Sequence, residues 1–102
     1  MGLFELLENI RKRPEHFLGN KSIVRLQVFL GGYNYHKAVT GLSKPEEDQI
    51  WIRFQRWVAQ RYEIKTNQSW MQIILFFSRD EFDALDNFFK LLDEFKQQVS
   101  YG

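Results

Sequence analysis

The residues best suited to chemistry are few in this sequence, and they do not cluster. His16 and His36 are the only histidines, and neither has a carboxylate or a second histidine at the spacing of a metal site or a catalytic pair. Cysteine is absent, which excludes a thiol nucleophile, a cysteine-based zinc site and a disulfide framework, and fits a reducing compartment. There is no glycine-rich phosphate loop and no serine in a nucleophile elbow. We therefore expect no catalytic activity, cofactor or metal.

Acidic side chains provide the clearest candidate for a binding site. The net charge is only +1, but the chain is basic near its N-terminus and acidic near its C-terminus. Helical spacing puts four acids opposite the aromatic side of the last predicted helix, namely Asp83, Asp86, Asp93 and Glu94, and Asp80 stands at the start of that helix. Such a face could imitate a phosphate backbone and bind a cationic nuclease cleft, whereas the simpler interpretation is a solvated surface. Ile52, predicted to point outward, is a weaker candidate anchor for the same partner.

Basic residues support an alternative function. Five cations lie in the first quarter of the chain: Arg11, Lys12, Arg13, Lys21 and Arg25. They favour a small helical nucleic-acid-binding or regulatory protein, which would bind DNA or RNA in a salt-dependent way. They also have a structural explanation, since cations near the end of a helix complement its dipole, and Glu8 and Lys12 are spaced for an ion pair.

Composition indicates what kind of domain carries these side chains. The chain has 102 residues, 44% hydrophobic and 17% aromatic, which suits one domain over residues 1–102 with an aromatic core. The longest apolar run, Ile73 to Phe77, is far shorter than the roughly 20 residues that cross a bilayer. We expect a soluble, cytoplasmic protein with no membrane contact, while the oligomeric state stays open.

The first half of the chain predicts two helices and a turn. Residues 3–12 have one apolar stripe, the residue before Pro14 disfavours a helix, and residues 15–19 are expected to form a turn that buries Phe17 and Leu18. Residues 22–39 have two apolar faces, which are typical of a helix in the middle of a bundle. Within them, Gly31 and Gly32 predict a close helix contact or a kink.

The second half predicts three further helices. Pro45 and the three acids after it are typical of a helix start, and that helix extends to about Tyr62. Residues 68–77 have the composition of a strand, but their helical spacing and the N-cap candidates Asn67 and Ser69 favour a helix. The last helix starts after Ser78 or Asp80 and has an aromatic stripe that includes Phe82. The predicted fold is therefore all-α, a bundle of about five helices.

Beyond these patterns, much of the chain, from about residue 3 to residue 95, resembles a family of small helical bacterial immunity proteins. The matching positions are the segment from Ile10 to Gly19, with its basic residues, proline, aromatic residue and glycine, and then Ser22, Leu26, Phe29, Leu30, Gly32, Tyr33, Phe54, Trp57, Val58, Arg61, Tyr62 and Trp70. His16 departs from this pattern, in which methionine stands. A segment of gyrase-type ATPase domains is similar to Arg11–Gly19, but the nucleotide-binding motifs of those domains are absent downstream.

The resemblance implies a function without catalysis. Proteins of that family belong to polymorphic toxin and contact-dependent growth inhibition systems, where each blocks a cognate toxin domain, often a nuclease. The matching residues are of the kind that determine a fold, so the resemblance does not indicate which surface binds the toxin.

Overall fold

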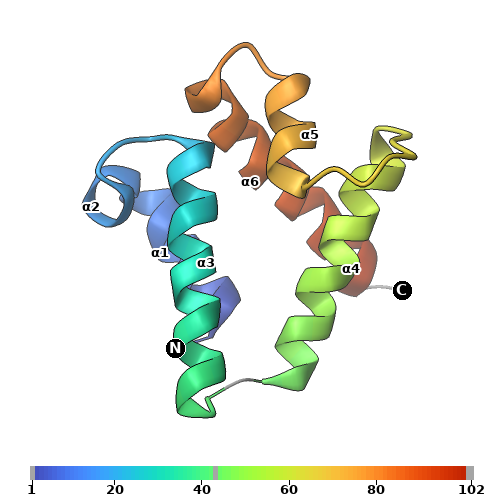
Figure 1. Cartoon of the computed structure of the whole chain (residues 1–102). Coiled ribbons are helices and arrows are strands. Elements are labelled where there is room, and N and C mark those ends of the chain that lie inside the picture. Colours follow the sequence, from blue (N-terminus) through green and yellow to red (C-terminus); the bar gives the residue numbers. More distant parts are fainter. Residues whose placement is uncertain (1, 43, 101–102) are drawn as a thin grey trace.

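The computed structural model describes residues 2–42 and 44–100, the last two as backbone only, and all their regular structure is helical. Its helices are α1 (Leu3–Lys12), α2 (Pro14–Leu18), α3 (Ile23–Thr40), α4 (Pro45–Arg61), α5 (Trp70–Phe76) and α6 (Glu81–Ser100). Figure 1 shows α3 running down the left of the view and α4 running up the right, with α6 passing behind both and α5 near the upper ends of α3 and α4. The all-α prediction is confirmed, with six helices instead of about five.

The additional helix is the segment that the sequence predicted to be a turn. Pro14 occupies the first position of α2, where its missing N–H costs nothing. Gly19 follows the last residue of α2, and its φ of 84° suits glycine. Ser22 then caps α3 by accepting hydrogen bonds from two backbone N–H groups. Leu18 is buried and Phe17 half-buried, so both turn inward as predicted.

Aromatic rings from three helices form the centre of the core. Phe54 of α4 is fully buried and contacts Phe88 and Phe95 of α6, with ring centroids 5.7 Å and 5.4 Å away. Trp51 of α4 contacts Trp70 of α5 at 5.5 Å. Trp51 also contacts Phe54 and Phe88, so these rings form one continuous cluster.

Helix α5 settles the ambiguity between helix and strand at residues 68–77. The Ser69 hydroxyl accepts the Gln72 N–H, and the Gln72 side chain accepts the Ser69 N–H in return, which forms a complete capping box. Trp70, Ile73 and Ile74 are buried at helical spacing. The helix prediction is therefore correct.

Helix α3 differs from the expectation of a central helix buried on two sides. One side, which includes Ile23, Leu26 and Leu30, is buried in the core. The other side is exposed, because the remaining helices all pack on the first side or beyond the ends. A Cβ placed on Gly31 or Gly32 would meet nothing within 4 Å. The predicted close contact of another helix at these glycines is therefore absent from the described chain.

An ion-pair cluster holds together the ends of α3 and α4 near their linker. Lys37, only 6% exposed, donates to Glu47 at 3.1 Å and to Asp48 at 3.4 Å. Burial alone would lower the pKa of Lys37, but these two carboxylates outweigh it and raise that pKa above its ordinary value. The pKa of Glu47 is lowered, because hydrogen bonds from the Leu3 N–H and Lys37 outweigh its desolvation. Glu47 thus links α1, α3 and α4.

Among the described residues, no helix is both long enough and apolar enough to cross a membrane.

Candidate functional site

The predicted acidic face lies along α6, where each of its five acids has a partner within the chain. Asp80 caps α6 by accepting from the N–H groups of Phe82 and Asp83. The others form ion pairs, Asp83 with Arg79, Asp86 with Lys21, Asp93 with Arg11 and Glu94 with Arg61. Lys90, which lies between Asp86 and Glu94 in sequence, has no ion pair in the described part of the chain. The charge of this face is therefore largely compensated, except at the start of α6.

The ion pair of Asp93 consists of two short, parallel hydrogen bonds. Arg11 donates to both carboxylate oxygens of Asp93, at 2.8 Å and 2.7 Å, and these hydrogen bonds lower the pKa of Asp93. Its guanidinium also lies over the Phe89 ring, 5.5 Å from the centroid. Glu8 pairs with Arg11 and Lys96 instead of the predicted Lys12.

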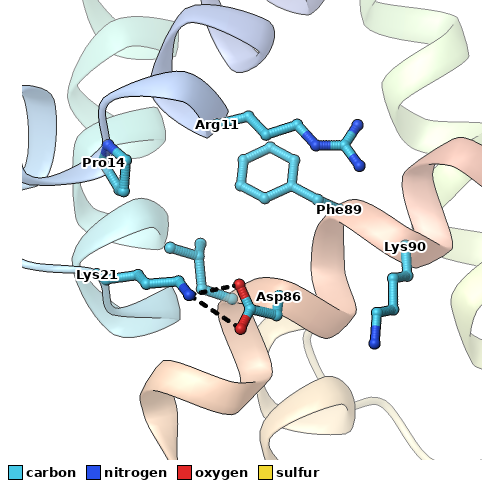
Figure 2. Close-up of a pocket in the computed structure, with 7 residues that line it drawn as sticks. Arg11, Pro14, Lys21, Asp86, Phe89 and Lys90 are labelled. Atoms are coloured by element: carbon cyan, nitrogen blue, oxygen red, sulfur yellow. Dashed lines mark hydrogen bonds and ion pairs between the residues drawn. The ribbon is translucent and has the colours of Figure 1, made fainter.

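A hollow of about 230 Å³ separates α6 from the α1–α3 region at this point (Figure 2). It is lined by Arg11, Pro14, Lys21, Leu85, Asp86, Phe89 and Lys90. Figure 2 shows the Lys21 ammonium directed at both carboxylate oxygens of Asp86, and Lys90 pointing away from them. The charged groups of Arg11 and Lys21 at this hollow are therefore already bound to carboxylates of α6 and are not free to bind a ligand.

The basic cluster is split by the same contacts. Arg11 and Lys21 bind carboxylates of α6, and Arg25 donates to the Leu18 carbonyl oxygen at 3.1 Å. Lys12 and Arg13 are exposed. Nucleic-acid binding by all five cations stays a prediction, but three of them have internal partners that phosphates would have to displace.

Exposed aromatic rings gather at the connection between α5 and α6, which we call the α5–α6 corner and define as residues 76–83. Phe76 is 79% exposed, Phe77 48% and Phe82 46%. The Phe77 ring contacts Phe76 at 5.0 Å and stacks on Tyr62 at 4.6 Å, so part of the group is fixed against α4. Phe82, which the sequence puts on the aromatic stripe of the last helix, is instead half exposed in the first turn of α6.

Polar contacts hold this corner in one conformation. The Ser78 hydroxyl donates to the Ile74 carbonyl and accepts from the Asn87 side chain. The Asp83 carboxylate accepts the Arg79 N–H at 3.0 Å and the Asn87 amide at 3.3 Å. The Arg79 N–H and side chain are the main reason that the pKa of Asp83 is lowered. Asp83 therefore shapes the corner in addition to supplying charge.

Ile52 lies on α4 with 46% of its surface exposed, as its position off the apolar stripe predicts. Phe76 likewise lies outside the repeat formed by Trp70, Ile73 and Ile74. The sequence alone did not separate an exposed aromatic residue from one covered by a neighbouring helix.

In the described chain, no group of three or more His, Cys, Asp or Glu side chains has the geometry to hold a metal ion.

Comparisons of this chain with protein-family models, with curated proteins and with solved structures find no match.

Proposed function

We propose that this protein is an immunity protein, which binds a cognate bacterial toxin domain in the cytoplasm and neutralises it by covering its active site. The resemblance to that family, which extends from about residue 3 to residue 95, motivates the proposal. The observation that carries it is the α5–α6 corner, where exposed aromatic rings stand beside acidic side chains.

The corner has the composition of a tight protein interface. Binding energy is concentrated in a few aromatic anchors surrounded by polar residues that exclude water, and truncating an anchor costs about 2 kcal/mol or more. Phe76 is the most exposed large apolar side chain of the corner, and Phe77 beside it is partly fixed by Tyr62. Because hydrogen bonds already order the corner, little conformational entropy is lost on binding.

Charge at the corner favours a cationic partner. Asp80, Glu81 and Asp83 stand within one turn of the helix start, and Arg79 pairs with Asp83. A nuclease cleft, which is built to bind phosphates, has the complementary sign. The rest of the acidic face, towards Asp93 and Glu94, is compensated by ion pairs and contributes less to this attraction.

A capture experiment tests the function. The tagged protein is coexpressed with the domain encoded by the reading frame immediately upstream of its gene, and copurification with suppression of that domain's toxicity is the expected result. Failure to protect cells from that domain, or binding of duplex DNA at moderate salt that depends on Arg11 and Lys21, would contradict the proposal.

Paired variants test the surface. Phe76→Ser is expected to weaken toxin binding about 30-fold, the equivalent of about 2 kcal/mol, without lowering stability because the ring is exposed. Ile52→Ser is the matched control, since it removes a similarly apolar exposed side chain from α4. Loss of binding with Ile52→Ser and not with Phe76→Ser would place the contact on α4 instead.

Asp86→Asn is expected to slow association at low salt only slightly, because Lys21 already compensates Asp86.

A further inference from the structure

The outward side of α3 is an apolar surface that no helix covers. Its members, which we call the α3 seam, are Val24, Val28, Gly31, Gly32, Tyr35 and Val39. At Val28, Tyr35 and Val39, between 65% and 73% of the residue surface is exposed, and Leu42 just beyond the helix is 62% exposed. Successive members are separated by one, three or four residues, so they form one continuous stripe on the helix.

The order of residues in the α3 seam is symmetric about the glycine pair. Val28 lies three residues before Gly31, and Tyr35 lies three residues after Gly32. Val24 lies seven residues before Gly31, and Val39 lies seven residues after Gly32. In an antiparallel pair with its two-fold axis at the glycines, residue i of one copy faces residue j of the other while j faces i. The order of the seam would therefore put apolar side chains opposite apolar side chains.

We propose that two copies of this chain pair through the α3 seam, with antiparallel α3 helices that cross at Gly31 and Gly32. In this arrangement Val28 of each copy packs against Tyr35 of the other, and Val24 packs against Val39. The glycines lie at the crossing point, where the absence of side chains lets the two backbones approach. This explains the glycine pair, which has open space on the single chain.

The size of the seam suits a reversible dimer. Its exposed side chains offer on the order of 600 Å² per chain, so that a pair would bury about 1,200 Å², the lower end of the range for specific interfaces. Interfaces of this size have affinities that depend on anchor quality, and here Tyr35 is the large anchor. We expect dissociation in the micromolar range.

Charge on α3 is compatible with contact between two identical surfaces. No acidic residue lies between Ile23 and Thr40, and two of the three basic side chains are already engaged. Arg25 donates to the Leu18 carbonyl, and Lys37 is buried against Glu47 and Asp48. The seam itself carries no charged side chain, so self-association brings together neither like charges nor desolvated ones.

Sedimentation equilibrium from about 10 to 500 µM measures the association. The wild-type mass is expected to rise towards that of a dimer, and Val28→Glu is expected to raise the dissociation constant at least tenfold. Ile52→Glu is the matched control, because it puts the same charge on an exposed apolar residue of α4, and it should dimerise like the wild type. A wild-type mass that stays monomeric over this range overturns the proposal, as does equal weakening by both variants.

The glycine pair separates an interface role from a structural one. Gly31→Ala with Gly32→Ala should stabilise the folded monomer, because alanine favours a helix and the space is open, yet weaken the dimer several-fold by keeping the backbones apart. An unchanged dissociation constant would contradict crossing at this point.

Crosslinking tests the antiparallel arrangement in the full chain, which has no cysteine of its own. Val24→Cys and Val39→Cys chains, treated with a short bismaleimide, should crosslink when mixed and not when alone, because identical positions would lie about 22 Å apart. Crosslinking within each single variant would show a parallel pair and refute the proposed geometry. These outcomes are independent of toxin binding, which is tested at the α5–α6 corner.

Discussion

Replacing Lys37 by methionine should destabilise the protein by about 2 kcal/mol. The substitution keeps most of the apolar stem but removes an ammonium that binds Glu47 at 3.1 Å and Asp48 at 3.4 Å. A hydrogen bond to a charged group contributes about 1.5–3 kcal/mol. The loss should be smaller than the roughly 3–5 kcal/mol for a fully buried pair, because Glu47 keeps the Leu3 N–H and Asp48 is partly exposed. The ratio of folded to unfolded protein would fall about 30-fold.

Urea unfolding followed by circular dichroism measures this change. Lys12→Met is the matched control, because Lys12 is exposed, and it should shift the midpoint little. In a double-mutant cycle, Lys37→Met and Glu47→Gln should couple by at least about 1 kcal/mol. Additive effects would refute the reasoning, since they would mean that the two side chains do not stabilise each other in the folded protein.

The stability difference between wild type and Lys37→Met should depend on pH, and it should decrease at both low and high pH. The pKa of Glu47 is lowered by folding, so its contribution is present above its unfolded pKa of about 4.3 and is lost as the pH falls through the folded pKa. The pKa of Lys37 is raised, so its contribution is present below about 10.4 and is lost as the pH rises through the folded pKa. The stability difference between wild type and variant should therefore be constant from about pH 5 to pH 9 and shrink outside that window.

Two further predictions concern the core and the capping of α5. Phe54→Ala should cost about 4 kcal/mol in urea unfolding, because the fully buried ring packs against Phe88 and Phe95 of α6. Phe54→Leu should cost much less, and similar losses in the two variants would contradict the ring packing. Ser69→Ala should cost about 1 kcal/mol and speed hydrogen exchange at the Gln72 N–H, while Ser69→Thr should restore both; an unaffected exchange rate would show that the capping box contributes nothing.

Local signals in the sequence determined most of the helices. Pro45 with its following acids, Ser69 with Gln72, and the apolar stripe of residues 3–12 each act within one or two helical turns, so the residues that define the element are all present in the segment. The short helix α2 was missed because a single turn of helix and a tight turn share the same proline and glycine signals.

What the sequence alone determined is therefore an all-α chain with an aromatic core and a charge difference between its two ends. Only the tertiary structure decided which surfaces stay free, because exposure depends on neighbours distant along the chain. Packing buried one side of α3 and left Val28 and Tyr35 exposed, although both sides have the same apolar pattern. It also brought Arg11 to Asp93 and Lys21 to Asp86, which compensates an acidic face that looks free in the sequence, and left Phe76 to project from the corner.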